Sequence, residues 1–312
     1  MAQKGTVIKS TGSQYIVRAD DGTLHTCRIK GKMRLDDIKS TNPVAVGDFV
    51  IFEDAPLHNA DEDGAITELL PRKNYVVRKS TNLSKQTHVL AANVDQALLV
   101  VTINYPITTP IFIDRFLASA EAYGVPVVII FNKVDRYTAA NLAELDVYKD
   151  LYSSMGYQVI DVCAKQELGL DKVKEILKDK VSVVAGHSGV GKSTLINRIQ
   201  PGLNLKTDEI SEVNNSGKHT TTYAEMHTFS FGGYVIDTPG IRGFGITNIN
   251  KDEISHYFRD IFSISSQCQY GNCTHMHEPG CAVKRAVEEG TLALSRYQSY
   301  VNIYESSTSK YR

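Results

Sequence analysis

The sequence predicts a multidomain protein in which a small β-barrel is followed by a doubly wound α/β domain and a mainly helical segment. Short stretches of alternating polarity fill the first part of the chain, and apolar strands alternate with amphipathic helices through the middle. Near the end, three cysteines and two histidines lie within 14 residues. These observations place the domain boundaries at 1–72, 73–245 and 246–312.

Composition restricts the class of protein before any motif is considered. The 312 residues are 42% hydrophobic, which is enough to build more than one core, and the net charge of −1 argues against a general polyanion binder. The first residues lack the apolar stretch of a signal peptide, and the apolar runs are too short to cross a membrane. Five cysteines, an odd number, fit a reducing compartment. We expect a cytoplasmic protein without membrane contact.

The first 72 residues predict an OB-like barrel. About five short strands are separated by turn signals that begin at Asp21, Gly47 and Asp63. Strands this short and this closely spaced favour a sheet that closes on itself, and the five-stranded OB-fold is the form that fits their number.

A basic stretch follows one of these barrel strands. The segment "CRIKGKMRL" contains Arg28, Lys30, Lys32 and Arg34. OB barrels often bind nucleic acid across this region, mainly through phosphate contacts that weaken with salt. Charge alone is equally compatible with a solvated strand face, so both interpretations stay open.

The middle of the chain predicts a parallel sheet covered by helices. Apolar strands such as "DQALLVVTI", "PVVIIFNK", "YQVIDVCAK", "VSVVAG" and "YVIDTPG" alternate with amphipathic segments. In such a sheet, the loops that follow the strands gather at one edge, where ligands bind. Each polar motif of this region comes directly after a strand, so we expect the motifs to meet.

The segment "GHSGVGKST" matches the phosphate-binding pattern G-x-x-x-x-G-K-[ST] and lies between a strand and a helix. Its glycines let backbone N–H groups point at phosphate oxygens, and the next helix adds its positive end. Lys192 would reach the β- and γ-phosphates, and Ser193 would bind Mg²⁺. The candidate residues are Gly186, His187, Ser188, Gly189, Val190, Gly191, Lys192, Ser193 and Thr194.

Two further motifs suit a nucleotide that carries Mg²⁺. Asp237 opens "DTPG" at the end of a strand, as a direct or second-sphere carboxylate for Mg²⁺, and the Gly240 N–H is placed to sense the γ-phosphate. A run of three threonines precedes that strand, and the Thr221 or Thr220 hydroxyl could complete the Mg²⁺ shell when GTP is bound. A threonine run that merely leads into a strand is the other interpretation.

The segment "NKVD" supplies a test for the base. The Asp135 carboxylate can accept hydrogen bonds from N1–H and N2–H₂ of guanine, which adenine does not offer. Asn132 would brace the loop and contact the base, and the stem of Lys133 would lie along its face. The motif therefore favours GTP and GDP over adenine nucleotides.

The segment "CAK" ends the next strand, where GTPases usually carry Ser-Ala-Lys. Cys163 replaces the serine, and Ala164 and Lys165 follow it; a backbone N–H here would contact guanine O6, which the change to cysteine leaves intact. Both base-reading motifs precede the phosphate loop, whereas the order is reversed in Ras-type GTPases. Because a parallel sheet tolerates a different cut in the chain, the order predicts a circularly permuted GTPase.

The cysteine cluster has the spacing C-x₄-C-x-H-x₅-C. Cys268, Cys273, His275 and Cys281 would form a closed tetrahedral shell suited to one structural Zn²⁺. His277 is the alternative nitrogen ligand, and we rank it second. The metal would replace a core in a segment too short to build one.

The order "NKVD", "CAK", "GHSGVGKSTL", "GKHTTT", "DTPGIRGFG" and then the cysteine cluster resembles the RsgA (YjeQ/YloQ) family over nearly the whole chain. These are circularly permuted GTPases that depend on the small ribosomal subunit. The resemblance implies a late-stage assembly factor of the bacterial small subunit whose GTPase is stimulated by the subunit, with hydrolysis favouring release. It also implies rRNA as a partner, no DNA, and a monomer.

The residue that positions the attacking water is the open point of this resemblance. Ile241 stands where Ras-type enzymes carry a glutamine, and Asn248 stands where many family members carry a histidine. Asn248 could orient water but cannot act as a base at neutral pH, and His219 is a second candidate. Gly189 lacks the amide that some GTPases use to bind K⁺. The candidate catalytic residues are Lys192, Thr221, Gly240, Asn248 and His219.

Two other functions remain open at this point. A GTP-gated RNA-binding regulator with negligible turnover is compatible with the aliphatic Ile241. A P-loop kinase or transferase is less favoured, because no segment specifies a pocket for an acceptor substrate.

Overall fold

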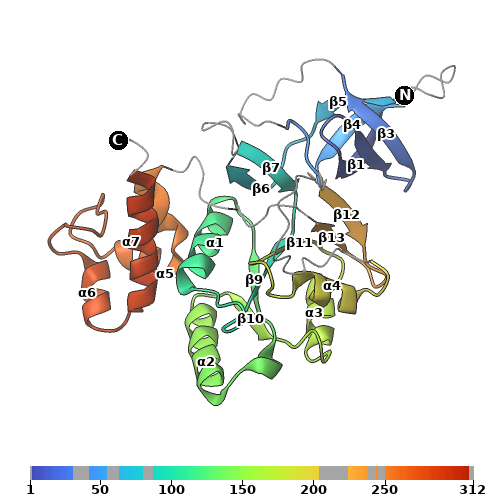
Figure 1. Cartoon of the computed structure of the whole chain (residues 1–312). Coiled ribbons are helices and arrows are strands. Elements are labelled where there is room, and N and C mark those ends of the chain that lie inside the picture. The colour runs from blue at the N-terminus through green and yellow to red at the C-terminus, as the bar shows by residue number, and fades with distance from the viewer. Residues whose placement is uncertain are drawn as a thin grey trace, which may run out of the picture.

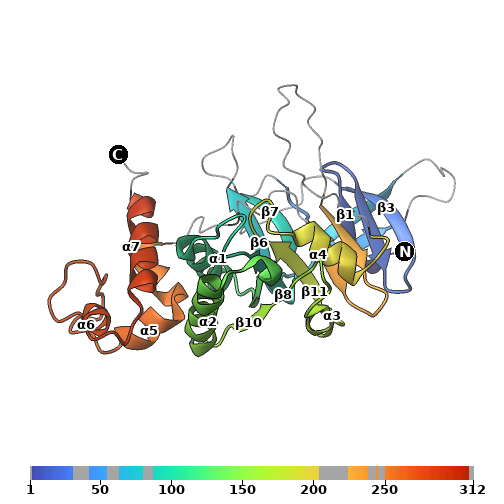
Figure 2. The ribbon, with the colours of Figure 1, turned by 60° about the horizontal axis from the view of Figure 1, so that its bottom comes forward.

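The computed structural model shows three bodies in a row, with the barrel at one end and the C-terminal helices at the other (Figures 1 and 2). It describes residues 2–30, 42–54, 63–79, 87–203, 224–237, 244 and 250–308. Within these ranges no helix has the length and apolarity needed to cross a membrane.

The N-terminal body is a closed five-stranded barrel, as predicted. Its strands are β1 (Ala2–Ser10), β2 (Tyr15–Ala19), β3 (Leu24–Ile29), β4 (Phe49–Glu53) and β5 (Gly64–Leu69). The pairing runs β1-β2-β3-β5-β4, and β4 returns to β1 to close the barrel. Alternate residues of the strands, including Val7, Val17, Phe52 and Ile66, are fully buried inside it. This alternation is the pattern from which the barrel was predicted.

A two-stranded hairpin, β6 (Tyr75–Lys79) and β7 (Thr87–Ala92), connects the barrel to the α/β body. Gly47 of the barrel contacts the end of β7 so closely that an added Cβ would lie 2.0 Å from the Ala92 carbonyl oxygen. Its φ of +93° is also a conformation that favours glycine. The "GD" signal at this position therefore marks a junction between domains as well as a turn.

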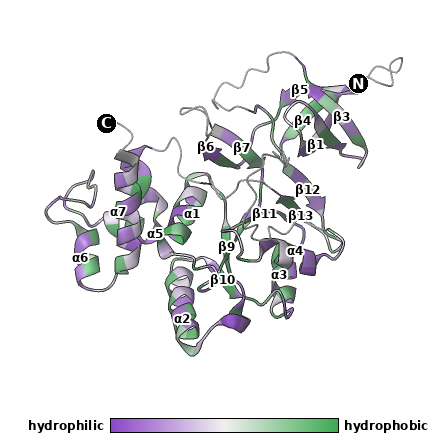
Figure 3. Cartoon of the chain, in the orientation of Figure 1, coloured by the Kyte–Doolittle hydropathy of each residue, from purple (hydrophilic) through white to green (hydrophobic). Residues whose placement is uncertain are grey.

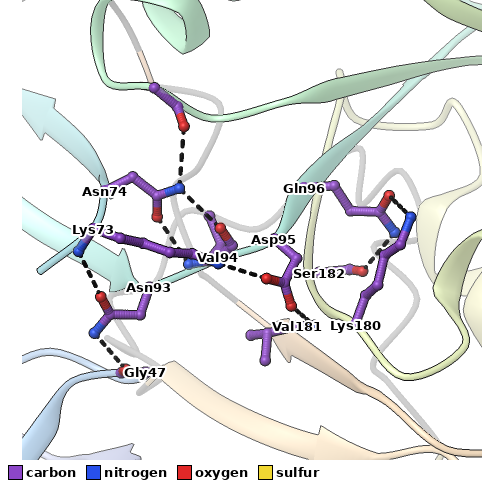
Figure 4. A network of polar contacts seen from close by, with 11 residues as sticks. Gly47, Lys73, Asn74, Asn93, Val94, Asp95, Gln96, Lys180, Val181 and Ser182 are labelled. Atoms are coloured by element: carbon purple, nitrogen blue, oxygen red, sulfur yellow. Dashed lines mark hydrogen bonds and ion pairs between the residues drawn. The ribbon is translucent and has the colours of Figure 1, made fainter.

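A polar network fixes the chain where the hairpin enters the main sheet (Figure 4). Asn93 accepts from the Lys73 backbone N–H at 2.9 Å and donates to the Gly47 carbonyl at 3.0 Å. The Asn74 side chain exchanges two hydrogen bonds with the Val94 backbone. These buried amides satisfy the backbone groups that the change of direction leaves unpaired.

The central body is a doubly wound α/β domain, as predicted, with the sheet order β10-β9-β8-β11-β13-β12. Only β12 runs antiparallel to its neighbour. The strands are mostly apolar in Figure 3, whereas the helices show both colours, because the strands are covered on both faces. The elements are β8 (Gln96–Val101), α1 (Pro110–Ala122), β9 (Val127–Phe131), η1 (Val134–Arg136), α2 (Ala139–Ser154), β10 (Gln158–Asp161), α3 (Leu170–Leu177), β11 (Val181–Ala185), α4 (Lys192–Ile199), β12 (Ala224–Thr228) and β13 (Tyr234–Asp237).

The C-terminal body is mainly helical, as predicted, and packs on α1. It consists of η3 (Lys251–Tyr257), α5 (Arg259–Ser265), α6 (Ala282–Glu288) and α7 (Leu294–Thr308). Its apolar core includes Ile254, Phe258 and Tyr300, together with Ala118 of α1. The helical body and the α/β body therefore share one core.

A buried arginine forms the polar part of this contact. Arg296 is 1% exposed and donates to both carboxylate oxygens of Asp260, at 2.8 and 3.0 Å, and to Asp114 of α1. Tyr152 of α2 also donates to Asp114, at 2.9 Å. Burial raises the pKa of Asp114, and the Arg296 charge opposes this shift.

Replacing Arg296 by alanine should destabilise the chain by about 3–5 kcal/mol, because two carboxylates would lose their buried cation. Denaturant unfolding measures this loss. Arg115→Ala is the matched control, because Arg115 bonds Asn302 at the exposed surface of the same contact, and it should cost about 0.5 kcal/mol or less. A loss below about 1 kcal/mol for Arg296→Ala would contradict the prediction.

Candidate nucleotide-binding site

The phosphate-binding pattern forms a tight loop between β11 and α4, as its sequence predicts. Gly186, Gly189 and Gly191 all have positive φ values, of +139°, +79° and +96°. A Cβ on Gly186 would lie 2.1 Å from the Val100 carbonyl oxygen. The glycines thus serve both the curvature of the loop and its close approach to β8.

The lysine of this loop folds back over it. Lys192 Nζ donates to the carbonyl oxygens of Gly186 at 3.0 Å and of His187 at 2.7 Å. These contacts hold the ammonium group against the loop whose backbone N–H groups would meet a phosphate. Ser193 follows it in the first turn of α4.

Asn132 joins the base-reading motif to the other two loops. It is buried; its side-chain Nδ2 donates to the Val190 carbonyl at 2.8 Å, and its Oδ1 accepts from the Ala164 N–H at 3.1 Å. The Tyr137 hydroxyl donates to the Asn132 carbonyl at 2.9 Å. One amide side chain therefore fixes "NKVD", "CAK" and the phosphate loop relative to one another.

The Cys163 thiol supports the carboxylate that would read guanine. Its Sγ donates to Asp135 Oδ1 at 3.0 Å. Burial raises the pKa of the Cys163 thiol, and the hydrogen bond to Asp135 raises it further, so the thiol stays protonated and remains a donor. The cysteine thus fills the bracing position of the usual serine, through a weaker S–H donor.

Lys133 lies across the mouth of the site. Its backbone is left-handed, with a φ of +64°, and its Nζ donates to the carbonyl oxygens of Tyr105 and Gly189. Burial lowers the pKa of Lys133, the nearby Arg136 adds to this shift, and Asp135 opposes it. The lysine stem therefore runs from the base-reading loop to the phosphate loop.

A cavity of about 400 Å³ opens between these loops. It is lined by Asn132, Lys133, Asp135, Arg136, Cys163, Ala164, Lys165, Gly191 and Thr194. The first seven belong to the two base-reading segments, except Arg136, which directly follows "NKVD"; the last two belong to the phosphate loop and the helix after it. Segments that are distant in the sequence thus form one concave site at the carboxyl edge of the parallel sheet.

Asp237 lies at the same edge of the sheet. It ends β13, which runs parallel to β11, and the register pairs Val183 with Ile236. The strand before the phosphate loop and the strand before "DTPG" therefore end side by side. Asp237 thus ends its strand next to the strand that leads into the phosphate loop, as a Mg²⁺ site shared with Ser193 would require.

Several residues of this site were missed by the sequence reasoning. Arg136 lines the cavity and lies over the Tyr105 ring at 5.0 Å, and Phe112 of α1 lies against the ring of His187 at 3.7 Å. The Tyr137 hydroxyl donates a hydrogen bond to the Asn132 carbonyl. Arg136 and Tyr137 directly follow "NKVD", which is the only signal that pointed to them; the other contacts depend on the path of the 102–109 loop.

Several predicted residues lie outside the described part of the chain. They are Thr220, Thr221, His219, Gly240, Ile241 and Asn248 at the nucleotide site, and Lys32 and Arg34 on the barrel. The other two residues of the predicted basic stretch are described and form ion pairs at the surface, Arg28 with Asp63 and Lys30 with Glu53.

The cysteine cluster assembles as predicted. Ligand atoms of Cys268, Cys273, His275 and Cys281 all lie within 4.8 Å of one another. His275 Nδ1 is 3.6 Å from the sulfur atoms of Cys268 and Cys281. Three thiols and one imidazole fit a structural zinc site. His277 is exposed and lies outside the cluster, so the alternative ligand is not supported.

The cluster is held by the long C-terminal helix and by a carboxylate. Tyr297 and Tyr300 of α7 donate to the carbonyl oxygens of His275 and Thr274, at 2.8 and 2.7 Å. Burial acts to raise the pKa of Glu278, but hydrogen bonds from Thr274 and from backbone amides lower it to about 2. The loop thus takes its shape from α7 and Glu278 as well as from the ligands.

Changing Cys163 should affect guanine binding through Asp135. Cys163→Val removes the donor and should weaken GDP binding about tenfold, since one hydrogen bond to a charged group contributes about 1.5 kcal/mol. Cys163→Ser, the matched control, keeps a donor and should bind at least as tightly as the parent chain. Fluorescent-nucleotide titration compares the two. Equal affinities for both variants would contradict the assigned role.

Loss of one ligand from the Cys₃His cluster should unfold the C-terminal body and leave the base-reading site in place. Cys281→Ser should lower bound zinc well below one ion per chain and expose the shared core with α1. Metal analysis by mass spectrometry and hydrogen exchange of α7 measure both effects. Cys27→Ser, in the barrel, is the control for loss of a buried thiol. Full zinc retention by Cys281→Ser would be inconsistent with the assigned ligands.

Comparisons with known proteins agree with this geometry. The family model described as "RsgA GTPase" matches residues 69–247, and the "RsgA N-terminal domain" matches residues 4–66. "Small ribosomal subunit biogenesis GTPase RsgA 2" of Bacteroides thetaiotaomicron is 55% identical over 99% of both chains. "Small ribosomal subunit biogenesis GTPase RsgA" of Phocaeicola vulgatus is 53% identical over the same share.

Two solved structures have the same architecture. YjeQ from Thermotoga maritima is similar with a TM-score of 0.79 at 36% identity, over 98% of both chains. YloQ, described as a circularly permuted GTPase, is similar with a TM-score of 0.75 at 28% identity, over 99% of this chain and 96% of the other. The likeness covers the barrel, the α/β body and the helical body together.

Proposed function

Because the chain belongs to the RsgA family of circularly permuted GTPases, we propose that it hydrolyses GTP to GDP and phosphate during late maturation of the bacterial small ribosomal subunit. The printed names of its relatives support the subunit as its partner. The observation that carries the proposal is the cavity that Asp135 and Gly191 line together, since one ligand bound there would contact both the base-reading loop and the phosphate loop.

The positions of the described residues support a role for each of them in this reaction. Asp135, which is exposed in the structure, accepts from the guanine N1–H and N2–H₂; adenine is rejected because it would cover the carboxylate without offering either donor. Lys192 exchanges its two carbonyl contacts for the β- and γ-phosphates. Ser193 and Asp237 would hold Mg²⁺, which when bound offsets charge on the phosphate oxygens.

The residues that complete the reaction remain proposals. Thr221 or Thr220 would add to the Mg²⁺ shell, and the Gly240 N–H would contact the γ-phosphate. Asn248 or His219 would orient the attacking water, because the aliphatic Ile241 cannot. Slow turnover by the isolated chain and stimulation by the subunit follow from this incomplete site.

The partner and the division into domains are part of the proposal. We propose that the barrel (1–72) and the zinc-binding body (246–312) contact rRNA, and that 73–245 performs the catalysis. Arg28 and Lys30 are ion-paired with barrel carboxylates, so binding rRNA through them would require exchange of these partners for phosphate. Such contacts weaken with salt. A monomeric, cytoplasmic protein fits this role.

The decisive activity test is phosphate release titrated with purified small subunits. We expect slow intrinsic hydrolysis, a rise with added subunits, and loss of both with Lys192→Ala, because that cation is required at the phosphates. Lys174→Ala, on the exposed face of α3, is the charge-matched control. Hydrolysis that subunits do not raise would support the alternative, a GTP-gated regulator with negligible turnover.

Base specificity gives a second test that does not depend on turnover. Asp135→Asn should weaken GDP binding about 100-fold or more, and should favour xanthosine diphosphate, whose C2 carbonyl accepts from the new amide. Asp146→Asn, on α2, is the matched control. Competition titration measures both nucleotides. Unchanged preference for GDP in Asp135→Asn would show that another residue reads the base.

A further inference from the structure

The barrel and the α/β body share one continuous sheet, joined where β1 meets β12 (Figure 1). The strands are antiparallel, with Lys9 opposite Glu225 and Ser10 opposite Ala224. Without β1, β12 would be an edge strand with free backbone groups, which other strands can join. The chain fills this edge with its own barrel, so the barrel is attached to a strand of the catalytic body.

The strand register connects the contact between β1 and β12 to the nucleotide site. Glu225 lies opposite Lys9 on one side and opposite Asp237 of β13 on the other. Residues directly opposite in antiparallel strands project from the same face of a sheet. Lys9, Glu225 and Asp237 therefore form a row across three strands that ends at the proposed Mg²⁺ carboxylate.

The charges in this row depend on one another. Glu225 and Asp237 are directly opposite residues of the strand pair, and like charges so placed destabilise a strand pair. Lys9 Nζ offsets this from the barrel side, 2.9 Å from Glu225 Oε2. Mg²⁺ bound beside Asp237 would offset it from the other side. Occupation of the nucleotide site should therefore strengthen the pairing of β12 with β1.

Further contacts couple the position of the barrel to the positions of β12 and β13. Ile8 of β1 packs against the core of the α/β body, as does Ala224. Arg18 of β2 lies over the Tyr234 ring, at the beginning of β13, with 4.5 Å to the ring centroid. Because packed contacts of this kind do not deform continuously, a shift of β13 moves the barrel or breaks the contacts.

We propose that β1 is part of the GTP-sensing machinery: Lys9 couples the barrel through Glu225 to Asp237, so that the barrel is held more firmly in the GTP state than in the GDP state. The proposal rests on the proposed function and adds its regulation. Asp237 opens "DTPG", whose Gly240 N–H is proposed to contact the γ-phosphate, which GTP carries and GDP lacks. The surface offered to rRNA thereby depends on the nucleotide.

Hydrogen exchange of the full chain tests this. Amides of β1 should exchange about fivefold more slowly with Mg²⁺ and a non-hydrolysable GTP analogue than with Mg²⁺ and GDP, a coupling of ordinary size. Lys9→Glu should abolish this difference in a chain that still binds GDP, because the guanine cavity lies on the far side of β11. Lys9→Gln, a milder change, should reduce the difference.

Lys4→Glu is the matched control. Lys4 lies on the same strand but pairs with β4, and its ammonium faces the Phe49 ring. It should keep the full nucleotide dependence. Exchange of β1 that is the same with both nucleotides, or a difference that persists in Lys9→Glu, would overturn the proposal and leave the proposed GTPase intact. A chain that binds no guanine nucleotide would overturn both.

Discussion

The site depends on the buried side-chain amide of Asn132. It donates to the Val190 carbonyl of the phosphate loop and accepts from the Ala164 N–H of the second base-reading loop. These partners lie 58 and 32 residues away in the sequence. An amide can make both bonds at once because it carries a donor and an acceptor at fixed geometry. The relative position of base reader and phosphate reader is thus set by one residue, whatever the order of the loops along the chain.

This explains how the permuted order is compatible with a GTPase site. The loops meet because their strands, β9, β10, β11 and β13, end at one edge of a mostly parallel sheet. Moving the chain termini to another connection leaves that edge unchanged. The permutation instead changes which elements the flanking bodies contact. The barrel pairs with β12, and the helical body packs on α1 through Arg296. Both flanking bodies therefore contact elements of the catalytic fold directly.

Much of this could be predicted from local sequence. The glycines at 186, 189 and 191 and the spacing of the cysteines each impose a geometry that few other structures satisfy. The alternation of strands and helices predicted the parallel sheet. The motifs at the ends of its strands predicted where the site lies. The contacts of Cys163 with Asp135 and of Lys9 with Glu225 could not be found this way, because they depend on register and on side-chain direction between distant segments. Likewise, the charge of Arg28 and Lys30 left a nucleic-acid surface and a solvated strand face both open, whereas the fold brings Asp63 and Glu53 against them.

The central claim is that the two kinds of loop bind one nucleotide. Hydrogen exchange followed during a GDP titration tests it most directly, by comparing the segment around Asn132 and Asp135 with the segment from Gly186 to Ser193. The account predicts that both become protected with the same half-saturation concentration. Protection of one segment without the other, or at a clearly different concentration, would contradict it.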